Sequence, residues 1–251
     1  MPADAPTAML APVVMLPEVA NSSEHVILLH GLARRSGSMD RMATALRDAG
    51  YSVANTGYSS RTAPVHALAA ATIAKALDVA EARRASCLHF VTHSMGGILV
   101  RDYLKHHRIE RLGRVVMLAP PNAGSEVVDR LRSWSLFRWI NGPAGQELGT
   151  DATSVPQRLG PVDFELGVIA GDRSINWINS LMITGPDDGK VSVRSTQVDG
   201  MSDHVVIHTT HPFIMKNRTA IRQTLMFLRT GAFEKTDGHQ SQADSSRTER
   251  R

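Results

Sequence analysis

Short apolar runs alternate with longer segments of helical periodicity along most of the chain. Residues 26–29 (Val-Ile-Leu-Leu) form an unbroken apolar run, which is the pattern of a strand covered on both faces. Similar runs predict further strands at residues 51–54, 87–91, 115–118, 164–169 and 204–207. Helical spacing of apolar positions predicts helices at residues 38–49, 64–84, 95–107 and 213–229. This alternation is typical of an α/β fold with a mostly parallel sheet, whose ligands bind at the carboxyl ends of the strands.

The alternation is interrupted once, at about residues 122–162. No clear strand is present there, and an amphipathic stretch contains Trp134, Phe137, Trp139 and Ile140. An insertion at this point predicts a cap or lid over the functional edge of the sheet. Its aromatic side chains either line an apolar substrate pocket or pack the cap onto the body. We take Trp134, Phe137 and Trp139 as candidate substrate-binding residues.

The remaining segments suggest a single large domain between two polar or irregular ends. Residues 24–233 carry the α/β pattern, residues 1–23 predict an extended arm, and residues 234–251 predict a disordered polar tail. The arm contains four prolines and precedes the first basic residue, Arg34, which argues against a signal peptide. No apolar run reaches the roughly 18 residues of a membrane-spanning helix. We therefore expect a cytoplasmic protein.

Composition narrows the possible partners. Of the 251 residues, 42% are hydrophobic and 21% are charged, which is enough for a sizeable core. The single cysteine, Cys87, cannot form an intramolecular disulfide and suits a reducing compartment. The net charge of +4 comes from scattered basic residues, and aromatics make up only 5%. These values argue against a nucleic-acid partner, and they leave the oligomeric state open.

The strongest chemical signal is the segment 92–97 (Thr-His-Ser-Met-Gly-Gly), which lies between an apolar strand and a predicted helix. A strand–turn–helix context of this kind is typical of a nucleophile elbow, in which a sharp turn exposes a serine above the sheet edge. Small residues flank such a serine because the two backbones nearly touch. Gly96 fits this requirement, whereas Thr92 stands where glycine is usual. Ser94 is the candidate nucleophile.

With this elbow the chain resembles the α/β-hydrolase superfamily, and more narrowly its lipase/esterase-like members. The resemblance extends from about residue 24 to residue 233. It rests on His-Gly-Leu at 30–32, the elbow at 92–97, Ala-Pro-Pro at 119–121, Asp-Gly-Lys-Val at 188–191 and a late histidine. Together and in this order, these elements are specific to the superfamily but not to a substrate.

A serine nucleophile needs a neighbouring base, and in this superfamily the order along the chain is serine, acid, histidine. Three histidines, His204, His208 and His211, follow the acid region. By resemblance the base lies at a strand-to-helix junction, which favours His211 and leaves His208 as second choice. A zinc site built from all three would require a helix, whereas residues 205–207 favour a strand. No metal is therefore expected.

Three aspartates compete for the role of the acid. Asp172 follows the strand at 164–169 most closely, and Asp187 and Asp188 come later in a Gly/Pro-rich turn. Lipase-like relatives carry the acid in an Asp-Gly-x-Val element, which is similar to residues 188–191. The resemblance therefore favours Asp188, with Asp187 and Asp172 as alternatives.

An ester-cleaving serine also needs N–H donors for the oxyanion that forms on attack. One donor is the backbone N–H after the nucleophile, here that of Met95. By resemblance to lipases the second is the N–H of Leu32, and His30 orients the loop that carries it. We also retain His30 as a candidate for substrate binding.

These residues predict a serine hydrolase that cleaves carboxylic esters through an acyl-enzyme. The substrate would be a small-molecule or lipid-like ester, and no cofactor is required. Thioester hydrolysis and acyl transfer use the same acyl-enzyme, so the residues do not separate them from ester hydrolysis. A non-catalytic protein on the same fold is the third hypothesis.

Overall fold

The computed structural model describes residues 24–82, 85–174 and 182–235. Its centre is a six-stranded sheet in the order β2-β1-β3-β4-β5-β6, in which all neighbouring strands are parallel. The strands are β1 (Glu24–Leu29), β2 (Ser52–Thr56), β3 (Cys87–His93), β4 (Leu112–Leu118), β5 (Leu166–Gly171) and β6 (Asp203–Ile207). The predicted α/β architecture with a mostly parallel sheet is confirmed.

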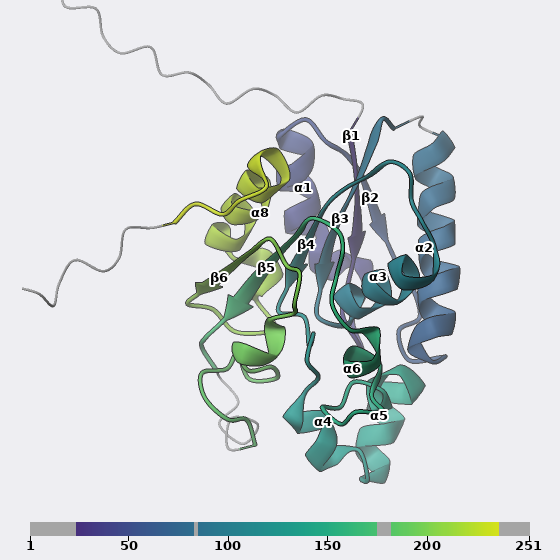
Figure 1. Ribbon diagram of the computed structural model, residues 1–251, viewed down its shortest axis with the longest axis vertical. Coiled ribbons are helices and arrows are strands. Elements are labelled where there is room, and N and C mark those ends of the chain that lie inside the picture. The colour runs from purple at the N-terminus through teal and green to yellow at the C-terminus, as the bar shows by residue number, and fades with distance from the viewer. Residues whose placement is uncertain (1–23, 83–84, 175–181, 236–251) are drawn as a thin grey trace, which may run out of the picture.

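Helices cover both faces of this sheet, which explains the unbroken apolar runs. Figure 1 shows α1 (Asp40–Asp48) and α8 (Arg218–Thr230) on one face, and α2 (Val65–Ala82) and α3 (Met95–His106) on the other. In β1, Val26 and Leu28 pack into the first layer, while Ile27 belongs to the core on the opposite face. All five residues after Glu24 in this strand are buried. Both faces of the strand must therefore be apolar.

The last helix begins later than its apolar pattern predicts. The predicted helix starts at residue 213, but residues Ile214–Lys216 form a short 3-10 turn and α8 starts at Arg218. The reason is a cap at Asn217, whose side-chain oxygen accepts the N–H groups of Thr219 and Ala220 at 2.8 and 3.1 Å. Such a cap satisfies donors that the helix itself leaves unpaired. It fixes the start of α8 and frees residues 208–213 for a loop.

Three short helices occupy the segment between β4 and β5. They are α4 (Glu126–Leu131), α5 (Ser135–Gln146) and α6 (Val155–Leu159), and Figure 1 shows them together at one end of the sheet. Arg101 of α3 anchors the two ends of this segment. Its guanidinium donates to the carbonyl of Asn122 at 2.8 Å and to that of Gly160 at 2.6 Å. Burial lowers the pKa of Arg101 to about 10.

The predicted arm at residues 1–23 lies outside the described residues, as does the predicted tail apart from residues 234 and 235. Among the helices that are described, none has the length and apolar character required to cross a lipid bilayer.

Candidate active site

Ser94 sits in a sharp turn between β3 and α3. Its backbone has φ 52° and ψ −124°, outside the conformations that non-glycine residues normally adopt. Strain of this kind costs on the order of 1–3 kcal/mol and persists only where the surroundings enforce it. Here β3 pairs with β1 and β4 on both sides, and the Ser94 N–H donates to the carbonyl of Leu118 at 2.8 Å. The turn is thus held at the carboxyl end of the central strands.

Two glycines provide the room that this turn requires. A side chain at Gly96 would bring its Cβ to 2.8 Å from the carbonyl oxygen of Leu29 and 2.9 Å from that of His30. A Cβ at Gly97 would lie 2.9 Å from the sulfur of Met117 and 3.2 Å from the hydroxyl oxygen of Thr92. The space at Gly97 therefore accommodates Thr92, the position that departs from the usual glycine.

We expect Gly96→Ala to lower the free energy of unfolding by about 2 kcal/mol, because the added methyl group meets rigid backbone oxygens. Urea unfolding measures the change. Gly57→Ala is the matched control, since a Cβ there meets only the Ser36 side chain at 3.5 Å. Equal stability of Gly96→Ala and Gly57→Ala would contradict the close approach at Gly96.

The structure brings Ser94, His211 and Asp188 into one hydrogen-bonded chain. The Nε2 atom of His211 lies 3.1 Å from the Ser94 hydroxyl oxygen, and its Nδ1 lies 2.7 Å from Oδ2 of Asp188. A carboxylate only accepts, so Nδ1 carries the proton and Nε2 offers a lone pair to the serine hydroxyl. The side chains of His211 and Asp188 are 4% and 1% exposed. This arrangement can remove the proton from Ser94 as its oxygen attacks.

The turn at residues 187–191 holds Asp188 in place. Its Oδ1 accepts the N–H groups of Lys190 and Val191 at 3.0 and 2.9 Å, and its carbonyl accepts the N–H of His211 at 2.9 Å. Each oxygen of the carboxylate thus has a defined partner. The turn positions the acid. Through the bond to the His211 N–H it also positions the loop at residues 208–213 that carries His211, called the histidine loop below.

The alternative aspartates have other partners. Asp187 accepts the N–H of Gly189 at 2.7 Å, within the same turn. Asp172 lies 3.0 Å from Nδ1 of His208, whose side chain is 73% exposed. Among the aspartates considered from the sequence, Asp188 is the one whose carboxylate contacts His211.

The three late histidines do not converge. His204 pairs with the hydroxyl of Thr196 at 3.0 Å, and His208 faces solvent beside Asp172. In the described part of the chain, the group that could hold a metal ion is instead His66, Asp102 and His106, whose ligand atoms lie within 4.8 Å of one another on α2 and α3. None of these three lines the cavity that contains Ser94.

His93, the residue before Ser94, holds the histidine loop through a hydrogen bond. Its Nε2 donates to the carbonyl of His211 at 3.1 Å, and the two rings are 4.8 Å apart. Burial holds the pKa of His93 well below its ordinary value, and the nearby charges of His211 and Arg34 lower it further. His93 therefore stays neutral beside a histidine that must become positively charged during proton transfer.

We expect the free energy of unfolding to fall as the pH drops below about 6.5. In that range the unfolded chain binds a proton at His93, whereas the folded chain keeps this histidine neutral, so acid favours unfolding. The free energy of unfolding then falls by up to about 1.4 kcal/mol per pH unit for one such group. Urea titrations from neutral to mildly acidic pH measure the slope. His93→Asn should make the slope shallower than in the wild type, and His107→Asn, which removes an exposed imidazole, is the control. An unchanged slope in His93→Asn would contradict this account.

The loop after β1 carries the second expected oxyanion donor. His30 is fully buried, stacks on Tyr58 at 4.2 Å and accepts the Tyr58 N–H at 3.3 Å. The Tyr58 hydroxyl in turn donates to the His30 carbonyl at 2.6 Å. These contacts fix the start of the loop and put Leu32 beside Ser94 on the wall of the same cavity. Met95 begins α3, where the first N–H groups of a helix lack helical acceptors.

Ser94 and His211 open into a cavity of about 230 Å³ whose walls are largely apolar. Phe137 lines this cavity, which is where a substrate-binding residue has to lie. Trp139 in α5 and Trp134 just before it do not line the cavity. These two residues are 77% and 63% exposed, because the docking of α5 turns Phe137 toward the cavity and both tryptophans toward solvent. His30 also lies outside the lining. Besides Leu32 and Phe137, the apolar lining residues are Pro121, Val127, Val128, Leu131, Ile140, Leu148 and Val191.

Sequence reasoning missed two cationic residues on this cavity. Arg34 and Lys190 both line it. In the sequence Arg34 stands out only as the first basic residue, and Lys190 only as part of the Asp-Gly-Lys-Val element. The spacing along the chain carried no signal for this pairing, because the two residues come from loops that follow different strands.

Solved structures with a similar fold include a lipase, a phospholipase and a carboxyl esterase. The mature lipase BlEst2 from Bacillus licheniformis matches with a TM-score of 0.63 and 18% identity, over 85% of this chain and 95% of that one. Phospholipase PlaB from Legionella pneumophila, in complex with thio-NAD, matches with a TM-score of 0.66 and 18% identity, over 82% of this chain but only 58% of PlaB. The metagenomic carboxyl esterase MGS0156 matches with a TM-score of 0.60 and 18% identity, over 84% and 70% of the two chains.

Comparison with curated proteins finds no match. A sequence model of the alpha/beta hydrolase family, however, matches residues 26–212. This range contains the elbow, the Asp-Gly-Lys-Val turn and His211, and it covers most of the chain. The protein therefore belongs to the alpha/beta hydrolase family.

Proposed function

We propose that this protein is a serine hydrolase that cleaves carboxylic esters. The observation that carries the proposal is the hydrogen-bonded chain from Asp188 through His211 to Ser94 at an apolar cavity. Family membership and the names of the structural neighbours, a lipase, a phospholipase and a carboxyl esterase, support an ester substrate at a coarse level.

In the first half of the reaction, the Ser94 oxygen attacks the ester carbonyl while its proton moves to Nε2 of His211. Asp188 holds the ring in the required tautomer and stabilises the resulting imidazolium. The carbonyl oxygen becomes an oxyanion that accepts the N–H groups of Leu32 and Met95, each worth about 3–4 kcal/mol in the transition state. The intermediate then collapses, the alcohol leaves with the proton from His211, and Ser94 carries the acyl group.

In the second half, water replaces the alcohol. His211 takes a proton from the water as its oxygen attacks the acyl-enzyme, and a second oxyanion forms in the same place. Its collapse returns the proton to the Ser94 oxygen and releases the carboxylic acid. Bond making and breaking involve only the ester, water and side chains of this protein.

The test is hydrolysis of p-nitrophenyl esters from acetate to palmitate by the purified protein. We expect turnover, with a preference for acyl chains that fit the apolar cavity lined by Phe137, Val128 and Leu148. Covalent labelling by a fluorophosphonate reports the nucleophile independently of chain length. Absence of both turnover and labelling would contradict the proposal.

A further inference from the structure

Two positive charges line the catalytic cavity and have no part in the proposed ester cleavage. Arg34 comes from the loop after β1, and Lys190 comes from the turn that carries Asp188. In the described part of the chain, neither side chain forms an ion pair. The charge of the Asp188 carboxylate acts on Lys190, but His211 and two backbone N–H groups already occupy its oxygens.

The surroundings of these charges do not neutralise them. Of the described residues that line the cavity, none is acidic. The pKa of Lys190 is lowered, first because the protein desolvates its ammonium group and second because of the charge of Arg34, although Lys190 as a whole is an exposed residue. Two like charges on the wall of one cavity, without an ion-pair partner, disfavour each other. An anion between them would relieve this repulsion.

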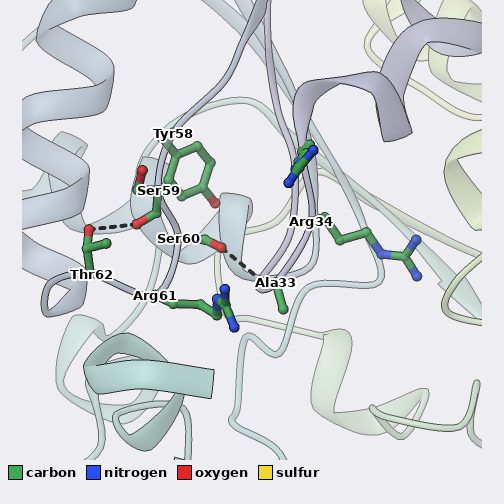
Figure 2. Close-up of a pocket in the computed structure, with 8 residues that line it drawn as sticks. Ala33, Arg34, Tyr58, Ser59, Ser60, Arg61 and Thr62 are labelled. Atoms are coloured by element: carbon green, nitrogen blue, oxygen red, sulfur yellow. Dashed lines mark hydrogen bonds between the residues drawn. The ribbon is translucent and has the colours of Figure 1, made fainter. Parts of the chain in front are cut away.

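A second cavity extends the positive surface away from the serine. It measures about 440 Å³, shares Arg34 with the catalytic cavity, and is also lined by Arg35, Arg61 and several hydroxyl groups. Arg34 lines both cavities, and Figure 2 shows its side chain and that of Arg61 on opposite sides of Ala33. No acidic side chain is among the residues described on this wall either. The two cavities thus share Arg34, and one of them is largely apolar while the other is lined by arginines.

We propose that the substrate of this site is an ester with one apolar half and one half that carries a carboxylate or phosphate, which Arg34 and Lys190 bind. This inference rests on the proposed ester hydrolysis. The apolar half lies against Phe137 and its neighbours, the scissile carbonyl lies at Ser94, and the anionic half lies toward the arginine-lined cavity. Arginine suits this role because its planar guanidinium binds both oxygens of a carboxylate or phosphate.

Two pairs of chromogenic esters test the proposal and show which half carries the charge. One pair places a carboxylate on the acyl side, as the p-nitrophenyl half-ester of adipic acid against p-nitrophenyl hexanoate. The other places it on the alcohol side, as the octanoate of a carboxylated nitrophenol against p-nitrophenyl octanoate. We expect kcat/KM for the charged ester to exceed that of its neutral partner about tenfold or more in one of the two pairs. Hydrogen bonds to charged groups have this magnitude.

Charge-removing variants then assign the effect. Arg34→Gln and Lys190→Gln should each lower the charged-to-neutral ratio of kcat/KM about tenfold, mainly through KM, and Arg34→Lys should retain part of it. Arg41→Gln and Lys75→Gln remove exposed charges elsewhere and should leave the ratio unchanged.

Three outcomes would overturn the inference, and they can be told apart. Turnover of neutral esters without a charge preference in either pair would leave ester hydrolysis intact and remove the anionic subsite. Equal losses for charged and neutral esters in the variants would mean that the two cations act on the oxyanion or on the fold. Failure to hydrolyse or to be labelled by a fluorophosphonate would overturn the proposed function, and this inference with it.

Discussion

Ser94→Ala is expected to lower kcat/KM for p-nitrophenyl esters by roughly 10⁴- to 10⁶-fold, the size of loss that follows removal of a nucleophilic serine. His211 and Asp188 keep their mutual contact in this variant, but no oxygen remains to attack the carbonyl. The residual rate would come from the oxyanion donors and the cavity acting on water. Steady-state kinetics with the preferred acyl chain, together with fluorophosphonate labelling, measures the effect.

The substitution is well suited to this purpose because alanine keeps the Cβ of serine. The strained backbone at φ 52° is therefore no more costly in the variant than in the wild type. Its unfolding transition should be close to that of the wild type. Ser133→Ala, which changes an exposed serine between α4 and α5, is the control and should retain full activity. Undiminished turnover by Ser94→Ala would show that the nucleophile lies elsewhere.

The parts of the fold that could be predicted are those set by local pattern. The strand before Ser94 and the helix after it were visible as a continuous apolar run and a helical repeat, and the structure confirms both as β3 and α3. The parallel sheet followed from the alternation of such runs. The start of α8 was missed because an apolar pattern does not register a cap at Asn217.

The contents of the cavity were less predictable, since they depend on contacts between distant segments. Phe137 and the two tryptophans share one amphipathic stretch, and only the docking of α5 separates the inward residue from the exposed ones. Arg34 and Lys190 line the same cavity because the loops after β1 and β5 both reach it, although the two residues lie far apart in the chain.

The role of Arg101, outside this cavity, was also missed, although a charged residue in an apolar helix is a visible signal of a buried polar contact.

The choice among the three candidate acids shows most clearly what the spacing of residues along the chain does not predict. Asp172, Asp187 and Asp188 all lie between β5 and β6, a connection long enough for any of them to reach the histidine loop. Only resemblance to lipases favoured Asp188. In the structure the difference is one of orientation within a single turn, where adjacent aspartates point to different partners. This difference gives a sharp experimental comparison.

Asp188→Asn is expected to lower kcat by roughly 10⁴-fold while leaving substrate binding nearly unchanged. An asparagine amide facing Nδ1 of His211 favours the tautomer whose proton is on Nε2, which then cannot accept the proton of Ser94. The imidazolium formed during proton transfer also loses its carboxylate. Steady-state kinetics of the wild type and variant with the preferred p-nitrophenyl ester measures the effect.

Asp187→Asn provides an unusually close control, because it makes the same chemical change one residue away. The asparagine oxygen can still accept the Gly189 N–H, so this variant should retain most of the activity. Asp172→Asn should do the same, since that carboxylate lies beside the exposed His208. Fluorophosphonate labelling should be slow but measurable in Asp188→Asn and absent in Ser94→Ala, because only the latter removes the attacking oxygen. A large loss in Asp187→Asn or Asp172→Asn, with Asp188→Asn active, would assign the acid to a different carboxylate and require a different position of the histidine loop during catalysis.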